Sequence, residues 1–258
     1  MAVDGTTLIT GASAGIGKAL AREFAANGHD LVLVARREER LTELAADLER
    51  DGVETHVVVQ DLASREAPDE LYDETTDRGI DVDILVNNVG IGTQGSFVEG
   101  DLDRELDQLQ LNVVTPTQLT HLYGREMGAR GHGGVLNVSS SAAWFPGPYM
   151  AVYYASKAYL KSFSEAIFEE LREAGVTVTA LCPGPVRTEF QARAQNTHTP
   201  LGSGRMQAVE TVARSGYSGL QAGTPVVVPG LRMRAVTRLS NLLPNAVTRR
   251  LTRRLNTP

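Results

Sequence analysis

The stretch that decides the fold is TGASAGIG, residues 10–17, which follows a short apolar run and precedes an amphipathic one. Its glycines at 11, 15 and 17 let the backbone turn tightly and approach a ligand without a Cβ in the way. A helix that begins in this loop directs its N-terminal amides and the positive end of its dipole at a bound phosphate. A glycine triplet is weak evidence alone, but here a strand precedes it, and a helix and a second strand follow. The segment therefore predicts a dinucleotide-binding βαβ unit.

The rest of the chain repeats this alternation of short apolar runs with longer amphipathic ones. Runs that are apolar on both faces are typical of parallel strands covered by helices. Their alternation with helical segments predicts a doubly wound sheet. The expected strands are TTLIT (6–10), DLVLVA (30–35), THVVVQ (55–60), DILVNN (83–88), GVLNVSS (134–140), VTVTALC (176–182) and PVVVPG (225–230), and the expected helices are 18–27, 38–50, 65–78, 102–129 and 151–174. We therefore expect an α/β fold in which 1–258 form a single Rossmann-like domain with helices on both faces of the parallel sheet.

Composition narrows the class of protein. Of 258 residues, 42% are hydrophobic and 22% are charged, which is ordinary for a globular chain. A net charge of −6 argues against nucleic acid as a partner, because neutralising phosphates needs a basic surface. The single cysteine, Cys182, excludes an intrachain disulfide and a cysteine-based zinc cluster, and we expect no metal. Because no secretory signal and no run of about 18 apolar residues is visible, we expect a cytoplasmic protein.

The end of the second expected strand distinguishes the two nicotinamide cofactors. An NAD site usually has Asp or Glu there, which accepts a hydrogen bond from the ribose 2′-hydroxyl. This chain instead has Arg36 and Arg37 after Ala35. A guanidinium binds a 2′-phosphate through charge-assisted hydrogen bonds, whereas a carboxylate repels it. We therefore predict NADP(H), with Arg36 as the main contact and Arg37 as the second. The alternative is that both arginines only begin a solvated helix.

Three motifs in a fixed order carry a resemblance to a known family. TGASAGIG at 10–17, NNVG at 87–90 and YYASK at 153–157 together resemble the classical short-chain dehydrogenase/reductase family over roughly residues 4–190. The resemblance implies an oxidoreductase that interconverts a carbonyl and a secondary alcohol by hydride transfer. Besides the two arginines, it implies cofactor contacts from Gly11, Ser13, Ala14, Gly15, Ile16, Gly17, Asp61, Leu62, Asn88, Val89, Gly90, Tyr153, Lys157, Pro183, Gly184, Val186 and Thr188. Position 89 is usually Ala in the family, so Val89 is a small departure that narrows the pocket.

Two tyrosines precede Lys157, and their spacing selects one of them. The family motif is Tyr-x-x-x-Lys, and Tyr153, unlike Tyr154, lies four residues before Lys157. Residues at i and i+4 are neighbours on one helix face, so Tyr153 is the predicted acid/base residue. A nearby ammonium and the positive nicotinamide ring favour tyrosinate, which lowers the tyrosine pKa from about 10 towards the working range.

The resemblance assigns three further roles. Lys157 is implied to bind the nicotinamide ribose. Ser140, which precedes Tyr153 by the family's usual interval, is implied to donate a hydrogen bond to the substrate oxygen, as in other sites that stabilise developing negative charge. Asn112 matches the asparagine that bends a helix and holds a water of the proton relay. For Asn112, an ordinary polar position in a long helix stays open as the alternative.

Two weakly patterned segments follow the sixth expected strand. Residues 189–223 contain polar and Gly-rich stretches, and we expect them to be a substrate lid that excludes water. Residues 231–258 are an arginine-rich helical tail interrupted by Pro244. Its helices either pack on the domain or on another subunit, or they lie on a membrane surface.

The substrate, the oligomer and the rival function rest mainly on resemblance. WFPGPYMAVYYASK (144–157) and the tail are similar to a bacterial subgroup near the acyl-chain and steroid reductases, which implies a lipophilic small-molecule carbonyl or alcohol. Family members are usually homodimers or homotetramers through their two longest helices, here 102–129 and 151–174. The alternative function is a catalytically silent NADP-binding regulator or scaffold. The unbroken set of four catalytic residues opposes that alternative.

Overall fold

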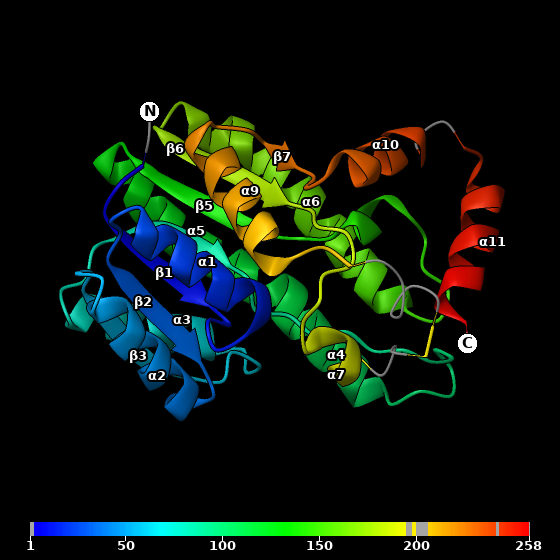
Figure 1. Ribbon diagram of the computed structural model, residues 1–258, viewed down its shortest axis with the longest axis horizontal. Helices are drawn as coiled ribbons and strands as arrows, with labels where there is room; N and C mark the ends of the chain where they lie inside the picture. The colour runs from blue at the N-terminus through cyan, green and yellow to red at the C-terminus, as the bar shows by residue number, and fades with distance from the viewer. Residues whose placement is uncertain (1–2, 195–197, 200–205, 241–242, 258) are drawn as a thin grey trace.

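A parallel β-sheet forms the centre of the protein (Figure 1). The computed structural model describes residues 3–194, 198–199, 206–240 and 243–257. Within these residues, seven strands pair in the order β3-β2-β1-β4-β5-β6-β7, and every pairing is parallel. The strands are β1 (Thr6–Thr10), β2 (Leu31–Ala35), β3 (Thr55–Val59), β4 (Val82–Asn87), β5 (Gly133–Val138), β6 (Val176–Leu181) and β7 (Val226–Val227). The predicted α/β doubly wound fold is confirmed.

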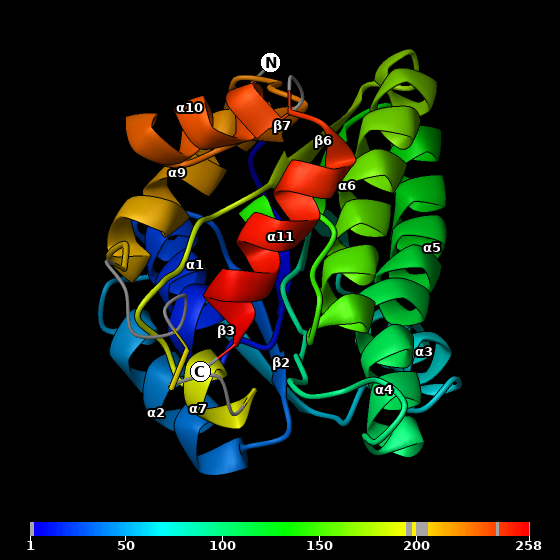
Figure 2. The same ribbon diagram turned by 90° about the vertical axis from the view of Figure 1, so that its right-hand side faces the viewer.

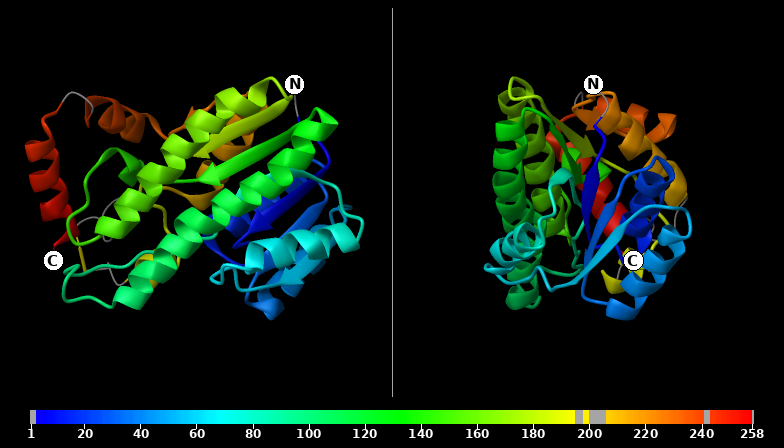
Figure 3. Two further views of the ribbon diagram at one scale, coloured as in Figure 1. Left: turned by 180° about the vertical axis from the view of Figure 1, so that it is seen from behind. Right: turned by 90° about the vertical axis from the view of Figure 1, so that its left-hand side faces the viewer.

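Helices cover both faces of this sheet (Figures 1 and 3). Successive strand side chains point to opposite faces, so Leu8 packs in one core and Ile9 in the other. The Ile9 side is covered by α1 (Gly15–Ala26), α2 (Glu38–Glu49) and α9 (Val209–Gln221). The Leu8 side is covered by α3 (Ala67–Asp77), α5 (Thr115–Arg130) and α6 (Ala151–Arg172).

The predicted helix 102–129 is interrupted rather than continuous. A π-helical turn, Gln110–Val114, joins α4 (Leu102–Leu109) to α5. Turns of this kind inside α-helices occur frequently at functional sites. Here the turn contains Asn112, whose side chain binds a neighbouring loop instead of facing solvent. A sequence period cannot reveal such a turn, because one extra residue barely changes the helical spacing.

Two predicted strands end at least two residues earlier in the structure than predicted. Only Val226–Val227 of the expected strand 225–230 pairs in the sheet, because the prolines at 225 and 229 have no N–H to donate. Strand β5 ends at Val138. Ser140 instead caps a short 3-10 helix, Ser141–Trp144, by accepting from the amide of Ala142 at 3.1 Å.

Helix α9 occupies part of the segment that was expected to be a lid, 189–223. Its Val212 and Leu220 are fully buried against the sheet. The helix packs closely on the sheet at Gly216 and Gly219, which have no side chain. A Cβ on Gly216 would lie 2.8 Å from Leu181 of β6, and a Cβ on Gly219 would collide with Val227 of β7. The glycines that resembled a loop in the sequence therefore permit close packing, and 209–221 belong to the core. Residues 195–197 and 200–205 of the expected lid lie outside the described residues.

The described part of the tail forms α10 (Leu231–Ser240) and α11 (Asn245–Asn256). Figure 2 shows α11 crossing one end of the molecule with α10 beside it. Outside the tail, the short helix α7 (Phe190–Arg193) follows β6 in the sequence. Among the described helices, none is long and apolar enough to cross a membrane.

Candidate active site

The segments that follow the strands meet at the carboxyl edge of the sheet, where doubly wound folds place their ligands. The loop after β1 carries the three glycines. Gly11 and Gly15 have φ values of +68° and +55°, in the left-handed region that favours glycine. A Cβ on Gly17 would collide with the carbonyl oxygen of Gly11 and lie 2.5 Å from Nδ2 of Asn88. Each predicted glycine is thus required by the local geometry.

The N-terminus of α1 fits an anionic ligand. Ala14 is its N-cap residue, and no described side chain caps the helix there. The first amides of a helix need partners, and a phosphate at this position satisfies them and the helix dipole together. The loop is therefore a cradle suited to the phosphates of a dinucleotide.

The glycine loop is fastened to the segment that follows β4. The hydroxyl of Thr10 accepts from the amides of Asn88 and Val89 at 2.9 and 3.1 Å and donates to the carbonyl of Val86 at 3.2 Å. In return, Nδ2 of Asn88 donates to the carbonyls of Thr10 and Gly11 at 2.9 and 3.3 Å. Thr10 was absent from the predicted site. The sequence signal that could have identified Thr10 is a hydroxyl-bearing residue at the end of the first strand, directly before Gly11.

The two arginines after β2 have different partners. Arg37 donates from Nη2 and Nε to the hydroxyl of Ser13 at 3.1 and 3.3 Å, which ties it to the glycine loop. Arg36 lies 3.3 Å from a carboxylate oxygen of Asp61, after β3, and its side chain is 63% exposed. Both guanidinium groups therefore lie beside predicted cofactor residues. Arg37, which was predicted as the second contact, is the arginine that is bound to the glycine loop.

Glu189 joins the start of α7 to the start of α2. Its carboxylate accepts from Nη1 of Arg40 at 2.6 Å and from Nη1 of Arg37 at 3.0 Å. The hydrogen bonds from Arg40, and then from Arg37, lower the pKa of Glu189 to about 2. Neither Arg40 nor Glu189 was predicted in the site, because residues so distant in sequence give no local signal of contact.

The segment after β6 lies over the glycine loop. A Cβ on Gly15 would lie 3.1 Å from Cγ2 of Thr188, so Thr188 borders the phosphate cradle. The carbonyl of Pro183 accepts from the amide of Ser141 at 2.8 Å, and Val186 pairs with Gln207. Three other predicted cofactor residues have side chains that pack in the core. Leu62 is buried, and Ile16 and Val89 pack against the two hydrophobic cores.

The residues predicted to be catalytic meet at the start of α6. Lys157 is buried, and its ammonium donates to the carbonyl of Val138 at 2.9 Å. That ammonium lies 5.9 Å from the centre of the Tyr153 ring. The hydroxyl of Ser140 hydrogen-bonds the half-buried Tyr153. Ser139, on the other side of the chain, donates to the carbonyl of Lys157 at 2.7 Å and so fastens α6 to the end of β5.

In the protein without a cofactor, burial is the main cause of the shifted pKa values of Tyr153 and Lys157. It raises the pKa of Tyr153 to about 12, and the hydrogen bond with Ser140 offsets part of this increase. Burial also lowers the pKa of Lys157 to about 8. The prediction that Lys157 lowers the pKa of Tyr153 is therefore wrong for the protein without a cofactor. The contribution of the positive nicotinamide ring stays a prediction.

The buried lysine predicts a pH dependence of stability. The pKa of Lys157 is about 8 in the folded protein against an ordinary value of 10.5, so the unfolded chain binds more protons between these values. The free energy of unfolding is expected to rise with pH across this window, by up to about 3 kcal/mol. In urea unfolding at successive pH values, Lys157→Met should remove this rise, and Lys18→Met on α1 should retain it. Equal slopes in the two variants would show that the buried lysine keeps its charge.

Asn112 is buried and holds the loop after β4. Its Nδ2 donates to the carbonyl of Ile91 at 2.9 Å and to the hydroxyl of Ser156 at 3.0 Å, and its Oδ1 accepts from the amide of Ile91 at 3.0 Å. A Cβ on Gly90 would lie 2.9 Å from Oδ1 of Asn112 and 3.4 Å from Nζ of Lys157. Asn112 thus lies in the π-helical turn beside Lys157 and is not an ordinary solvent-facing position of a long helix. Its role in holding a water stays a prediction.

An aromatic ring lies beside Tyr153, the predicted acid/base residue. The ring of Phe190, in α7, lies 5.3 Å from that of Tyr153 between centroids. A Cβ on Gly92 would lie 2.7 Å from Cζ of Phe190, so the loop after β4 also borders this ring. Phe190 was absent from the predicted site, and its position gives the neighbourhood of the Tyr153 ring an apolar wall.

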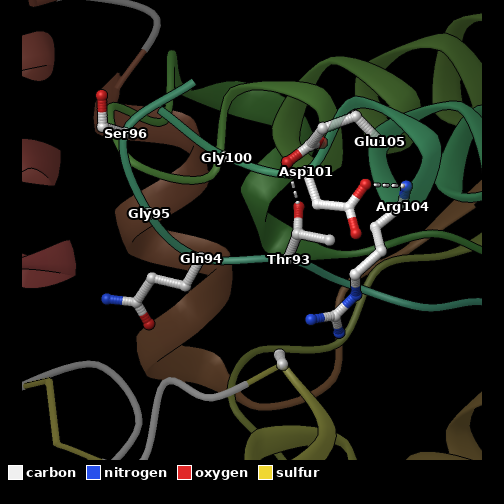
Figure 4. Close-up of a pocket in the computed structure, with 9 residues that line it drawn as sticks. Thr93, Gln94, Gly95, Ser96, Gly100, Asp101, Arg104 and Glu105 are labelled. Atoms are coloured by element: carbon white, nitrogen blue, oxygen red, sulfur yellow. Dashed lines mark hydrogen bonds between the residues drawn. The ribbon is translucent and has the colours of Figure 1, made fainter. Parts of the chain in front are cut away.

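A small polar cavity of about 60 Å³ lies between residues 93–96 and the start of α4 (Figure 4). The hydroxyl of Thr93 donates to Glu105 at 2.6 Å, and the amide of Thr93 donates to Gln108 at 2.9 Å. Asp101 caps α4 by accepting from the amides at 103 and 104. These bonds hold the loop after β4, and the cavity is too small to be the binding site of an organic substrate.

Comparisons with known proteins agree with this geometry. The chain is similar to the very-long-chain 3-oxoacyl-CoA reductase of Anas platyrhynchos, with 36% identity over 190 residues that cover 71% of this chain and 60% of the relative. The chain therefore spans only about 60% of that relative's length. Among solved structures, it is similar to a short-chain dehydrogenase from Sphingobium yanoikuyae in complex with NADPH, with 30% identity, a TM-score of 0.82, and coverage of 92% of this chain and 94% of that one.

A structure described as a 7beta-hydroxysteroid dehydrogenase gives a TM-score of 0.86 at 28% identity and covers 97% of both chains. Residues 5–199 match the family model for short chain dehydrogenases. This match includes the glycine loop, the residues predicted to be catalytic and the segment after β6. The chain belongs to the short chain dehydrogenase family.

Proposed function

We propose that the protein is an NADP(H)-dependent oxidoreductase that interconverts a carbonyl and a secondary alcohol. The observation that carries this proposal is the meeting of Ser140, Tyr153 and Lys157 beside the glycine cradle. When bound, the nicotinamide supplies the hydride to the carbonyl carbon or accepts it from the alcohol. The relatives named as reductases and dehydrogenases support this reaction class.

The residues at the edge of the cradle divide the remaining work. The raised pKa of Tyr153 keeps its hydroxyl protonated near neutral pH, which is the form that donates a proton when a carbonyl is reduced. Ser140 adds a hydrogen bond to the substrate oxygen as negative charge develops there. The Lys157 ammonium lies on the same side of α6 as the Tyr153 ring and would hydrogen-bond the nicotinamide ribose of a bound cofactor. The protonated state of Tyr153 is the one that the reduction of a carbonyl requires.

The preference for NADP(H) rests on the charge at the end of β2. Arg36 and Arg37 are where an NAD site has a carboxylate. Arg37 is already oriented by Ser13 of the glycine loop, and the exposed Arg36 is free to turn from Asp61 towards a 2′-phosphate. The solved relative in complex with NADPH supports this choice.

Arg36→Asp is expected to reverse the cofactor preference. It removes a charge-assisted bond to the 2′-phosphate and supplies an acceptor for the 2′-hydroxyl of NADH, so NADPH affinity should fall roughly 10- to 100-fold while NADH affinity rises. Fluorescence titration with each cofactor measures both. Arg50→Asp, at the exposed end of α2, changes the net charge equally and should leave the ratio of affinities unchanged. An unchanged ratio in Arg36→Asp would contradict the assignment.

We also propose a lipophilic substrate. Phe190 gives the Tyr153 ring an apolar neighbour, and the relatives include proteins named for long acyl chains and steroids. The test is the loss of NADPH absorbance with a series of 3-oxoacyl thioesters and ketones of increasing length. Each added CH₂ that is buried should raise kcat/KM about fourfold. A kcat/KM that is independent of chain length would exclude an apolar acyl site.

Self-association through α4, α5 and α6 is proposed as well. These helices lie side by side on one flank of the molecule (Figure 3), and Leu102, Leu106 and Tyr159 are exposed there. Burying such residues against a second copy is favourable. Light scattering at several protein concentrations distinguishes a dimer or a tetramer from a monomer, and a monomer throughout would contradict the proposal.

A further inference from the structure

The C-terminal tail is strongly basic in an acidic protein. Residues 231–258 contain seven arginines and no Asp or Glu, although the whole chain has a net charge of −6. No ion pair between described residues includes any of these arginines, and all of them are exposed. They are Arg232, Arg234, Arg238, Arg249, Arg250, Arg253 and Arg254. The tail therefore presents positive charge that the described part of the protein does not neutralise.

Helix α10 carries its leucines outward. Leu231 and Leu239 are 81% and 59% exposed, whereas Thr237 and Ser240 are buried. Leu231, Ala235 and Leu239 recur every four residues, which places them on one face of a helix. The usual surface helix turns its apolar face to the core and its polar face to water. Here the apolar stripe faces out and is flanked by arginines.

Helix α11 shows the same inversion. Thr248, Thr252 and Asn256, again four residues apart, are its buried residues, while Val247 and Leu251 are about half exposed. The hydroxyl of Thr252 donates to the carbonyl at 146 at 2.6 Å, and Nδ2 of Asn256 donates to the carbonyl at 148 at 2.9 Å. The polar face of α11 is thus bonded to the protein, which leaves its arginines and aliphatic residues outside.

An open apolar groove of about 350 Å³ lies next to α11. Phe145, Pro146, Pro148 and Tyr154 line it, together with Arg249 of α11. Figure 1 shows α10 and α11 at the same end of the molecule. Exposed aliphatic residues, an apolar groove and arginines that form no ion pair with another described residue therefore occur together at this end.

We propose that α10 and α11 dock the protein on an anionic lipid surface. Helices that lie in a membrane interface combine exposed apolar side chains with Lys or Arg, and anionic headgroups supply the opposite charge. A second copy meeting this surface tail to tail would bring like charges together, so lipid is the better occupant. The proposal does not depend on the reaction or its cofactor.

Co-sedimentation of the full-length protein with vesicles tests this docking. Binding is expected to vesicles that contain phosphatidylglycerol and not to phosphatidylcholine alone, and it should weaken with added salt. Replacing Arg234 and Arg238 by Gln should lower the partition coefficient about fivefold for each charge removed. Leu231→Ser should also weaken binding, because it removes the most exposed leucine of the stripe.

Matched controls lie away from the tail. Val59→Ser, at a 49% exposed position of the edge strand β3, and Arg50→Gln should leave vesicle binding unchanged. Light scattering on the same variants reports any change of oligomeric mass. The proposal is overturned if the protein ignores anionic vesicles, if the tail variants bind as well as the control variants, or if the tail substitutions change the oligomeric mass and leave vesicle binding intact.

Discussion

Tyr153→Phe is expected to lower kcat by roughly 10²- to 10⁴-fold, the usual contribution of a positioned acid or base. The substitution removes only the hydroxyl that Ser140 contacts and keeps the ring that packs beside Phe190. Dinucleotide affinity should therefore be nearly unchanged. Steady-state rates of NADPH consumption and a cofactor titration on the same protein measure the two effects separately.

Tyr154→Phe is the matched control for this prediction. Tyr154 is the adjacent residue on α6, but it is buried and its hydroxyl donates to Asn256 of α11 at 3.2 Å. Its loss should affect packing of the tail more than kcat. Full activity in Tyr153→Phe, or equal losses in the two variants, would contradict the assignment of Tyr153. A wild-type protein that binds NADPH tightly but turns over no substrate would favour the regulator or scaffold alternative.

Gly17→Ala is expected to have the second largest effect. The new Cβ would collide with the carbonyl of Gly11 and lie 2.5 Å from Nδ2 of Asn88, so the loop that bonds Asn88 to Thr10 and Gly11 must shift. Overpacking of this kind costs about 1–3 kcal/mol. We expect the free energy of unfolding to fall by that amount and dinucleotide affinity to fall at least about tenfold, because the amides that face the phosphates move with the loop.

Gly128→Ala distinguishes the collision from a general effect of removing glycine. Gly128 also lies inside a helix, α5, but its added Cβ would meet only Ala174, at 3.6 Å. Alanine is the better helix former by about 1 kcal/mol, so this variant should be as stable as the wild type or more stable, with unchanged cofactor affinity. Urea unfolding and cofactor titration compare the pair. Equal stability and affinity in the two variants would show that Gly17 is not constrained.

Sequence alone determined the features that depend on local spacing. The alternation of apolar and amphipathic runs predicted the parallel sheet, because each period belongs to one kind of element. The glycine loop predicted the phosphate cradle, since a turn with positive φ and close backbone approach needs residues without a Cβ. The interval of four residues separated Tyr153 from Tyr154 as the partner of Lys157.

Only the tertiary structure decided the features that depend on distant contacts. The bonds of Glu189 to Arg37 and Arg40 join segments far apart in the sequence. Glycines at 216 and 219 resembled a loop until the sheet showed why α9 needs them.

The ionisation of Tyr153 and the direction of the tail helices likewise required the folded chain. Burial, which no sequence pattern measures, outweighs the hydrogen bond with Ser140 and raises the pKa of Tyr153. In the tail, the periodicity of leucine and arginine was visible from the start, but it does not say which face turns inward. That choice was made by Thr252 and Asn256, whose side chains satisfy backbone carbonyls of another loop, because buried polar groups need hydrogen-bond partners.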